Sequence, residues 1–319
     1  MKYPLITIGI ASFNALNTIE KAINSALSQS WRPIEIVIVD DCSNDGTYEK
    51  LLTISSKSKI IRVFKNDKNY GIGFVRNQII EKTRGEFLAF FDDDDESMQE
   101  RLKIQYQRIN EYEKSLKSSS LIICHSSRKV IYPNGNISVE KTLGSNPNSQ
   151  IPFGKSVAKR ILLGKPLKDG YGACPTCSQM ARISTYQAVN GFDNKFRRSE
   201  DTEFCIRLAL NGAHFIGIKE PLVLQRMTKT FEKNLNIEFK YANMILKKHK
   251  IFIKKNGNYE FCLCWQRIKY IFYRRELYKF SILLFILIIK YPKETSIRFL
   301  QSLRTIKINL DYSKFHKKS

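Results

Sequence analysis

The sequence predicts an α/β protein with a doubly wound, mostly parallel sheet flanked by helices. Three observations support this fold class. Short apolar runs alternate with segments of helical periodicity between residues 5 and 91. The apolar runs lack polar alternation, which is typical of strands buried on both faces of a parallel sheet. Two of the runs end in consecutive aspartates, beginning at Asp40 and at Asp92. Such sheets bind ligands beyond the carboxyl ends of their strands, so we expect the functional site there.

Strand, helix and strand follow one another at the start of the chain. The apolar run of residues 5–11 predicts the first strand. The segment from Asn17 to Glu20 has the pattern of a capping box, which predicts a helix after it. The run 34–39 is bounded by a proline and by two aspartates, and it predicts a second buried strand.

The same alternation continues to residue 91. The turn Asn44-Asp45-Gly46 precedes a predicted helix near 47–56, and residues 60–64 predict the third strand. Apolar positions between 72 and 80 indicate a helix that ends before Gly85, and residues 87–91 predict the fourth strand.

Less regular segments follow the fourth strand. The segment from Ser97 to Glu100 is a second capping-box pattern, which predicts a long helix through about residue 116. Residues 121–124 and 128–132 predict two strands. The stretch 133–175 is rich in Gly, Pro, Asn and Ser, so it predicts a loop region, with one helix near 155–163.

Positive charge gathers in the last part of the chain. The whole sequence has 53 basic and 30 acidic residues, a net charge of +23, which predicts an anionic partner. Residues 229–319 hold 21 basic and 6 acidic side chains, so the tail carries +15 of this charge. We therefore expect an α/β domain over residues 1–228 and a helical, basic, membrane-associating region over residues 229–319.

The amino-terminal residues and the cysteines favour the cytoplasm. No small-residue cleavage site follows the first apolar run, and the seven cysteines are irregularly spaced. Cys174 and Cys177 form an isolated CxxC pattern without a second pair at zinc-finger spacing, so we interpret them as small buried or loop residues. We expect a cytoplasmic protein with reduced thiols.

An apolar segment lies in the middle of the tail. Residues 280–289 are uncharged, and Lys279 and Lys290 stand on either side. A helix needs about 20 apolar residues to cross a bilayer core, so this run is too short. An interfacial helix on an anionic membrane surface is the preferred interpretation, and a helix packed on the catalytic domain is the alternative.

Four aspartates, Asp92 to Asp95, directly follow the fourth predicted strand. Like charges this close raise one another's pKa unless a cation compensates them. Carboxylate oxygens without a nearby histidine favour Mg²⁺ or Mn²⁺, with a diphosphate completing the coordination sphere. A solvated acidic loop before the helix that follows Ser97 is the alternative.

These features together resemble the glycosyltransferases of family 2, which have the GT-A fold. The resemblance covers about residues 4–226. It is carried by segments that occur in the family's order: Ile8–Asn14, Ser25–Gln29, Glu35–Thr47, Asn69–Gly71, Arg76-Asn77, Gly85–Asp95, Gly191–Asp193 and Glu200-Asp201. It implies a GT-A-like catalytic domain over residues 1–228 and an inverting enzyme of the bacterial surface-polysaccharide type.

The resemblance also implies a set of donor-binding residues. Ala11, Ser12, Phe13 and Asn14 would hold the nucleoside of a nucleotide-diphosphate sugar, and Asp41 would accept a hydrogen bond from the ring N–H of the base. The family usually has Pro-Thr-Tyr-Asn where this chain has Ala-Ser-Phe-Asn. The family's tendency favours uridine as the nucleoside.

The acidic cluster takes the place of the family's Asp-X-Asp metal motif. By resemblance, Asp92 and Asp93 would contact the ribose or the ion, and Asp94 would be the direct metal ligand with Asp92 beside it. The chain has an additional aspartate at the X position. Arg76 belongs to the donor-binding set.

Asp201, next to Glu200, matches the family's catalytic base. A carboxylate there would take the proton from an acceptor hydroxyl as that hydroxyl attacks the anomeric carbon, which gives inversion. The alternative is ordinary acidic charge at the start of a helix. The chain lacks the Gln-X-X-Arg-Trp motif of processive synthases, so we expect one sugar to be transferred per encounter.

The expected partners follow from these assignments. They are a nucleotide-diphosphate sugar, a glycan or lipid-linked acceptor, Mg²⁺ or Mn²⁺, and the inner face of the cell membrane, without nucleic acid. A non-catalytic scaffold subunit that binds nucleotide sugar is one alternative, and a nucleic-acid-binding protein is another. A nucleotidyltransferase would need a Gly-rich phosphate loop after the first strand, and Ser12 to Leu16 is not one.

Overall fold

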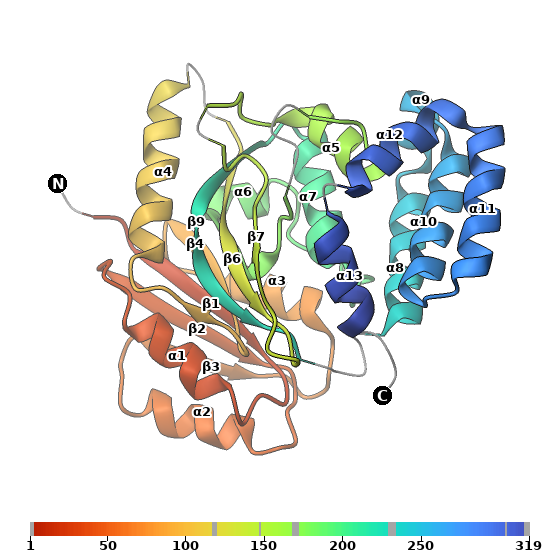
Figure 1. Cartoon of the computed structure of the whole chain (residues 1–319). Helices are drawn as coiled ribbons and strands as arrows, with labels where there is room; N and C mark the ends of the chain where they lie inside the picture. Colours follow the sequence, from red (N-terminus) through yellow and green to blue (C-terminus); the bar gives the residue numbers. More distant parts are fainter. Residues whose placement is uncertain are drawn as a thin grey trace. The chain divides into compact units, whose positions relative to one another are not determined.

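The computed structural model describes residues 3–116, 120–146, 148–167, 172–228, 234–303 and 305–315. The chain folds into two compact units. The first unit is Met1–Gly154 with Lys168–Met227, and the second is Lys155–Leu167 with Thr228–Ser319. Figure 1 shows the helices and strands of the whole chain, coloured along the sequence.

The first unit is built on one sheet. Its strand order is β3-β2-β1-β4-β8-β6-β9-β5, and β7 pairs with β6. The strands are β1 (Ile6–Ser12), β2 (Ile34–Asp40), β3 (Ile61–Lys65), β4 (Phe87–Asp92), β5 (Glu96–Ser97), β6 (Ile122–Ile131), β7 (Ile137–Glu140), β8 (Gln179–Arg182) and β9 (His214–Arg226). The helices of this unit are α1 (Ile19–Leu27), α2 (Thr47–Ser55), α3 (Ile72–Lys82), α4 (Arg101–Ser115), the 3₁₀ turn η1 (Thr176–Ser178), α6 (Ile183–Gln187) and α7 (Glu200–Leu210).

The sheet is mixed, with parallel and antiparallel pairs. β3, β2, β1 and β4 are parallel, as the alternation up to residue 91 predicts, and β6 and β9 also pair parallel. Antiparallel pairs occur after β4, because β8 runs antiparallel to both β4 and β6, β7 to β6 and β5 to β9. The turn Pro133–Gly135 connects β6 directly to β7, and a tight turn of this kind joins only antiparallel strands.

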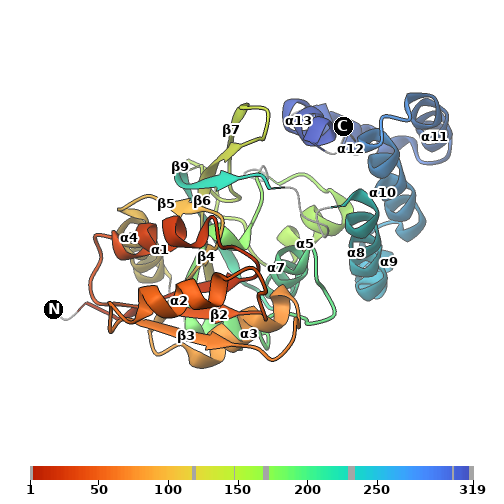
Figure 2. The same ribbon diagram turned by 90° about the horizontal axis from the view of Figure 1, so that it is seen from below.

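Helices cover both faces of the sheet. α1, α2 and α4 pack on the face that carries Ile6, Ile8 and Ile10 of β1 (Figure 1, Figure 2). α3 packs on the opposite face, where a β-carbon at Gly9 would lie 2.4 Å from a methyl carbon of Ile79. The absence of a side chain at Gly9 therefore allows α3 to approach β1 closely.

Two local predictions are wrong. Thr18 precedes α1 without a side-chain capping bond, so the first capping-box pattern does not form a capping box. Ser97 belongs to β5, where it pairs with Val223, and α4 begins only at Arg101. The hydroxyl of Ser97 accepts from the buried guanidinium of Arg101 at 2.8 Å instead of capping the helix.

The two strands predicted at 121–124 and 128–132 form the single strand β6. The register of β6 against β9 shifts at Ser126 and Ser127, which marks a β-bulge. The three polar residues from His125 to Ser127 suggest an interruption in the sequence, whereas in the structure they are buried inside a continuous strand.

The second unit is helical. It contains α5 (Gly154–Leu163), α8 (Leu235–Lys248), α9 (Lys250–Asn256), α10 (Tyr259–Tyr273), α11 (Leu277–Lys290), α12 (Pro292–Leu303) and α13 (Ile306–Phe315). Residues 155–167 join this unit although we expected them in the first domain, because the carbonyl of Leu162 accepts from Cys262 and from Arg298. Within the described part of the chain, no helix combines the length and the apolar character that crossing a bilayer requires.

Candidate active site

The carboxyl ends of β1 and β4 bring the predicted donor segment to the acidic cluster. The backbone N–H of Phe13, just after β1, donates to Asp93 Oδ2 at 3.0 Å. The Phe13 side chain is 47% exposed, so its ring is available to a ligand. Asn14 Oδ1 accepts from the Asn44 N–H at 3.0 Å, which ties this segment to the loop after β2. Residues 11–14 and Asp93 therefore lie together, as the resemblance implies.

Asp41 lies at the end of β2 and organises a neighbouring loop. Its Oδ1 accepts from Asn66 Nδ2 at 2.8 Å and from the Tyr70 N–H at 3.0 Å, and its Oδ2 accepts from the Gly71 N–H at 2.7 Å. Its side chain is buried. The structure thus assigns Asp41 to holding the loop that contains Gly71, and its predicted contact with a nucleobase stays a prediction.

The acidic cluster has two environments. Asp92, Asp93 and Asp94 are partly exposed, whereas Asp95 is only 4% exposed. Burial, together with the charges of Asp92 and Asp94, raises the pKa of Asp95 well above its usual range. One oxygen, Asp95 Oδ1, accepts from the Arg226 N–H at 3.1 Å, and the buried Oδ2 has no hydrogen-bond partner among the described residues.

This donor set fits a hard divalent cation. Ligand atoms of Asp92, Asp95 and Cys177 lie within 4.8 Å of one another. Burial raises the pKa of the Cys177 thiol well above its usual range, which favours the neutral thiol over the thiolate. Carboxylate oxygens remain, and these are the ligands that Mg²⁺ and Mn²⁺ prefer. The sequence did not single out Asp95 from the run of four, because its burial depends on the fold.

Arg76 connects the acidic cluster to the predicted base. Its guanidinium, on α3, forms a short ion pair with Glu200 and lies 3.3 Å from Asp92. Burial by itself lowers the pKa of Arg76, but the charges of Glu200 and Asp92 outweigh it, so that pKa is raised. Burial also raises the pKa of Glu200, against the attraction of Arg76. Glu200 is therefore engaged by Arg76, whereas its neighbour Asp201 is partly exposed.

The two carboxylate oxygens of Asp201 differ in their hydrogen bonding. Its Oδ1 accepts from the Thr202 N–H at 2.6 Å and from the Thr202 hydroxyl at 3.2 Å, and no described residue donates to Oδ2. Ser199, the residue before α7, has a left-handed backbone with φ of +59°. This conformation is uncommon for a residue with a β-carbon and occurs often at functional sites.

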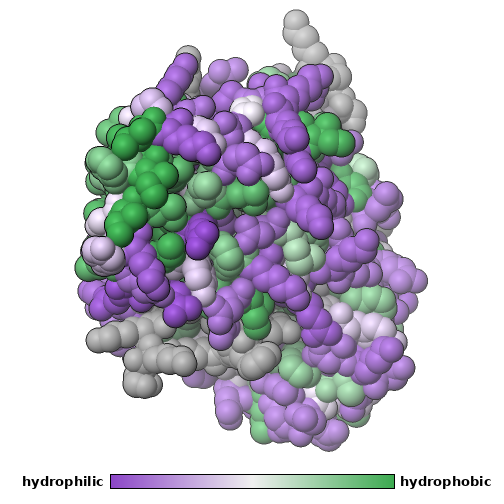
Figure 3. All heavy atoms as spheres, turned by 90° about the vertical axis from the view of Figure 1, so that its right-hand side faces the viewer, coloured by the Kyte–Doolittle hydropathy of each residue, from purple (hydrophilic) through white to green (hydrophobic). Residues whose placement is uncertain are grey.

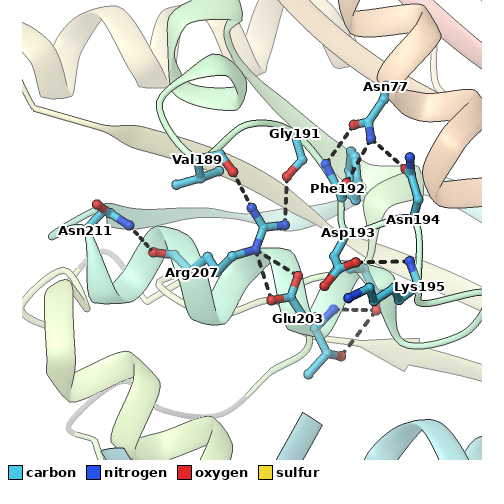
Figure 4. Close-up of polar contacts among 12 residues, drawn as sticks. Asn77, Val189, Gly191, Phe192, Asp193, Asn194, Lys195, Glu203, Arg207 and Asn211 are labelled. Atoms are coloured by element: carbon cyan, nitrogen blue, oxygen red, sulfur yellow. Dashed lines mark hydrogen bonds and ion pairs between the residues drawn. The ribbon is translucent and has the colours of Figure 1, made fainter. Parts of the chain in front are cut away.

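A hydrogen-bonded clamp holds the Gly191-Phe192-Asp193 turn near α3 and α7 (Figure 4). Asn77 Oδ1 accepts from the Phe192 N–H at 2.7 Å, and Asn77 Nδ2 donates to the Phe192 carbonyl at 2.8 Å. Arg207 of α7 donates to the Gly191 carbonyl at 2.7 Å and pairs with Glu203 at 2.9 Å. The motif residues Asn77 and Gly191 therefore have structural roles beside the site.

The CxxC residues do not act as a pair. The Cys177 sulfur lies with Asp92 and Asp95, while the Cys174 sulfur lies with His125 and Cys205. Cys177 is buried and Cys174 is partly exposed, and their interpretation as small buried or loop residues stays a prediction.

Comparisons with known proteins place the chain in a family. The profile of Glycosyl transferase family 2 matches residues 7–176. The succinoglycan biosynthesis protein ExoO of Rhizobium meliloti is 37% identical over 107 residues, which are 34% of this chain and 30% of that protein. The UDP-Glc:alpha-D-GlcNAc-diphosphoundecaprenol beta-1,3-glucosyltransferase WfaP of Escherichia coli is 40% identical over 91 residues, which are 28% of this chain and 36% of that protein. The matches thus span well under half the length of these relatives.

A solved structure shares the fold across almost the whole chain. S. aureus TarS 1-349, in complex with UDP-GlcNAc, superposes with a TM-score of 0.61 and 18% identity, covering 98% of this chain and 90% of that one. The expected GT-A-like fold with helices after it is thereby confirmed. Because the family profile matches more than half of its residues, the chain belongs to Glycosyl transferase family 2.

Proposed function

We propose that the protein is a metal-dependent glycosyltransferase that moves one sugar from a UDP-sugar to a hydroxyl of a lipid-linked glycan, with inversion. The donor would carry a hexosyl or N-acetylhexosaminyl group, and the product would serve bacterial surface-polysaccharide assembly. The proposal rests on one observation: the guanidinium of Arg76 contacts both Asp92 and Glu200. This arginine therefore brings the acidic cluster close to Glu200, the neighbour of the proposed base Asp201.

Donor binding would use the loops after β1 and β2. The exposed ring of Phe13 is suited to stack on a base, and residues 11–14 are held by contacts to Asp93 and Asn44. Asp41 would act from the neighbouring loop. The complex of TarS with UDP-GlcNAc supports a UDP-sugar as the donor.

Asp92 and Asp94 would hold Mg²⁺ or Mn²⁺, with Asp93 toward the ribose. When bound, such an ion offsets the negative charge that grows on the departing diphosphate. The raised pKa of Asp95, and its buried Oδ2 without a hydrogen-bond partner among the described residues, support a cation beside Asp92.

Asp201 would act as the general base. Its open Oδ2 would accept the proton of the acceptor hydroxyl as that oxygen bonds to the anomeric carbon and the bond to the diphosphate oxygen breaks. Attack from the side opposite the leaving group inverts the anomeric configuration. Glu200 would act as a positioning residue, since Arg76 holds its carboxylate.

A relative supports the proposed class of acceptor, and the positive charge of residues 229–319 supports the proposed location. The name of WfaP gives a diphosphoundecaprenol-linked acceptor for that protein, which supports a lipid-linked acceptor here. The tail carries +15, so we place the enzyme on the cytoplasmic face of the membrane as a peripheral protein.

A nucleotide-release assay tests the transfer reaction. The protein is incubated with Mn²⁺ or Mg²⁺, a panel of UDP-sugars and a membrane lipid extract, and free UDP is measured. We expect Asp201→Asn to lower release by about 10²- to 10⁴-fold without weakening UDP-sugar binding. Glu111→Gln, on an exposed carboxylate of α4, is the matched control and should leave the rate unchanged. Donor binding without release in the parent protein would instead indicate a non-catalytic scaffold.

A further inference from the structure

Helix α11 presents an apolar surface to solvent. Leu287 is its one buried residue among Leu277–Lys290. The exposed apolar side chains include Tyr278, Ile282, Phe285, Ile286 and Ile289, which recur at helical spacing. Figure 3 shows apolar side chains gathered on this face of the molecule, with polar side chains beside them. Exposed apolar area of this kind marks an interaction surface.

The size and ends of α11 suit a position in the membrane interface. Its 14 residues correspond to about 21 Å, too short to cross a bilayer core of about 30 Å. Lys279 and Lys290 are exposed at its two ends. Long basic side chains can keep their charge at the headgroup level while apolar neighbours enter the acyl region.

A cationic groove opens beside the first turn of α11. Its volume is about 500 Å³, and α8, α10 and α11 supply its walls. Arg267 of α10 and Arg274, the residue that follows the last residue of α10, are about two helical turns apart. Lys279 of α11 completes a set of three cations. Glu276 is the single carboxylate among the lining residues.

The cations of the groove are not fully neutralised. Glu276 pairs with Arg274 at 2.6 Å and with Lys279 at 2.7 Å. Arg267 is exposed and makes no hydrogen bond or ion pair with the residues that the structure describes. The groove therefore keeps an excess of two positive charges, one of them on an open guanidinium suited to bind a phosphate oxygen pair.

Aromatic and apolar side chains also line the groove. Phe239 and Tyr270 stack with ring centroids 4.6 Å apart, and Arg274 donates to the Tyr270 hydroxyl at 2.9 Å. A site that combines aromatic and cationic side chains fits an amphiphile better than a free inorganic ion, because both the polar and the apolar part of the ligand find partners.

We propose that this groove binds the phosphate of an anionic phospholipid headgroup while the apolar face of α11 enters the same membrane leaflet. The inference deepens the peripheral-membrane part of the proposed function and rests on it. Lys279 in the first turn of α11 and Glu276, the residue before this helix, both line the groove, so the headgroup site and the inserted face are continuous. Such a site would fix the depth and the orientation of the tail in the membrane, which unspecific attraction between its positive charge and anionic lipids does not do.

Vesicle flotation with the full chain tests the site. The vesicles are phosphatidylcholine alone or phosphatidylcholine with phosphatidylglycerol. We expect Arg267→Gln with Arg274→Gln to lower binding to phosphatidylglycerol vesicles at least tenfold. Lys254→Gln with Lys255→Gln, which removes the same charge from exposed positions of α9, is the matched control and should change binding less than threefold. Equal losses in the two variants would overturn the proposal in favour of diffuse attraction.

Two further experiments distinguish the membrane from other possible partners of this surface, namely a second copy of the chain and a soluble phosphate. Phe285→Ser with Ile289→Ser should abolish flotation, and circular dichroism checks that the variant is folded. A stable dimer of the parent chain that this variant dissociates, without loss of flotation, would overturn the proposal. Binding of glycerol 3-phosphate that Arg267→Gln with Arg274→Gln removes, without any loss of flotation, would also overturn it, because the groove would then be a site for a soluble phosphate.

UDP release distinguishes this inference from the transferase proposal. The groove variants should retain release from a UDP-sugar with a detergent-solubilised acceptor. In the parent protein, release without vesicle binding overturns the headgroup site alone, whereas vesicle binding without release from any donor overturns the transferase alone.

Discussion

Arg76 on α3 and Glu200 at the start of α7 form a buried ion pair across 124 positions of the sequence. The same guanidinium lies 3.3 Å from Asp92 at the end of β4. One cation therefore contacts carboxylates on both sides of the candidate active site. A change at Arg76 or Glu200 should affect stability and the placement of Asp201 together.

Removing the charge of Glu200 should destabilise the first unit. Glu200→Gln leaves Arg76 buried with Asp92 as its remaining ionic partner, so we expect a loss of about 3 kcal/mol in the free energy of unfolding. Urea titration measures it. Glu20→Gln is the matched control, because it breaks the more exposed pair with Lys50 and should cost much less. Similar losses in both variants would contradict the role given to Arg76.

Gly191 and Asn77 should show a coupled effect on stability. Gly191 has φ of +61°, and a β-carbon there would lie 2.2 Å from Asn77 Oδ1. We expect Gly191→Ala to cost about 3 kcal/mol, from backbone strain and the clash together. Adding Asn77→Ala removes the clash, so the double variant should lose at least about 1 kcal/mol less than the sum of the single losses.

Gly135 provides the control for backbone strain. It has φ of +81°, and a β-carbon there would meet nothing within 4 Å. Gly135→Ala should therefore cost only about 1 kcal/mol by denaturant unfolding. An equal cost at Gly135 and Gly191 would argue against the contact with Asn77.

Acid should destabilise the protein through His125. Burial, followed by the charges of Arg128 and Arg101, lowers the pKa of His125 to about 3. The pKa of this histidine in the unfolded chain is about 6.5, so His125 does not lower the free energy of unfolding above that pH. Below it, the free energy of unfolding falls, because the unfolded state binds a proton that the folded state excludes. The loss should reach about 2 kcal/mol at pH 5.

The variant His125→Gln isolates this contribution. Its unfolding free energy should depend less steeply on pH between 5 and 6.5 than that of the parent protein, as measured by urea titration at fixed pH. Identical slopes for the two proteins would show that other groups cause the acid sensitivity.

Divalent cation binding should stabilise the first unit through the acidic cluster. With UDP present, Mn²⁺ at 100 times its dissociation constant should add about 2.7 kcal/mol to the unfolding free energy. Asp94→Asn should remove most of this gain, and Glu111→Gln should keep it. Thermal unfolding with and without Mn²⁺ reads out binding directly, and an unchanged gain in Asp94→Asn would exclude Asp94 as a ligand.

The parallel half of the sheet is predictable because its causes are local. The apolar runs that form β1, β2 and β4 are continuous and bounded by turn residues, so their burial on both faces follows from the sequence. β6 and the short β5 are less predictable. Polar residues lie within β6, and β5 exists through its pairing with the distant Val223.

By itself, the sequence determined the parallel strands, the order of the family motifs, the acidic run after β4 and the short apolar segment of the basic tail, because each depends on neighbouring residues. Only the tertiary structure decided that Arg76 joins Asp92 to Glu200, that Asp95 is the buried aspartate, and that Asp41 holds the Gly71 loop. Burial and ion pairing depend on which distant segments meet, and that is fixed when the sheet and its helices pack.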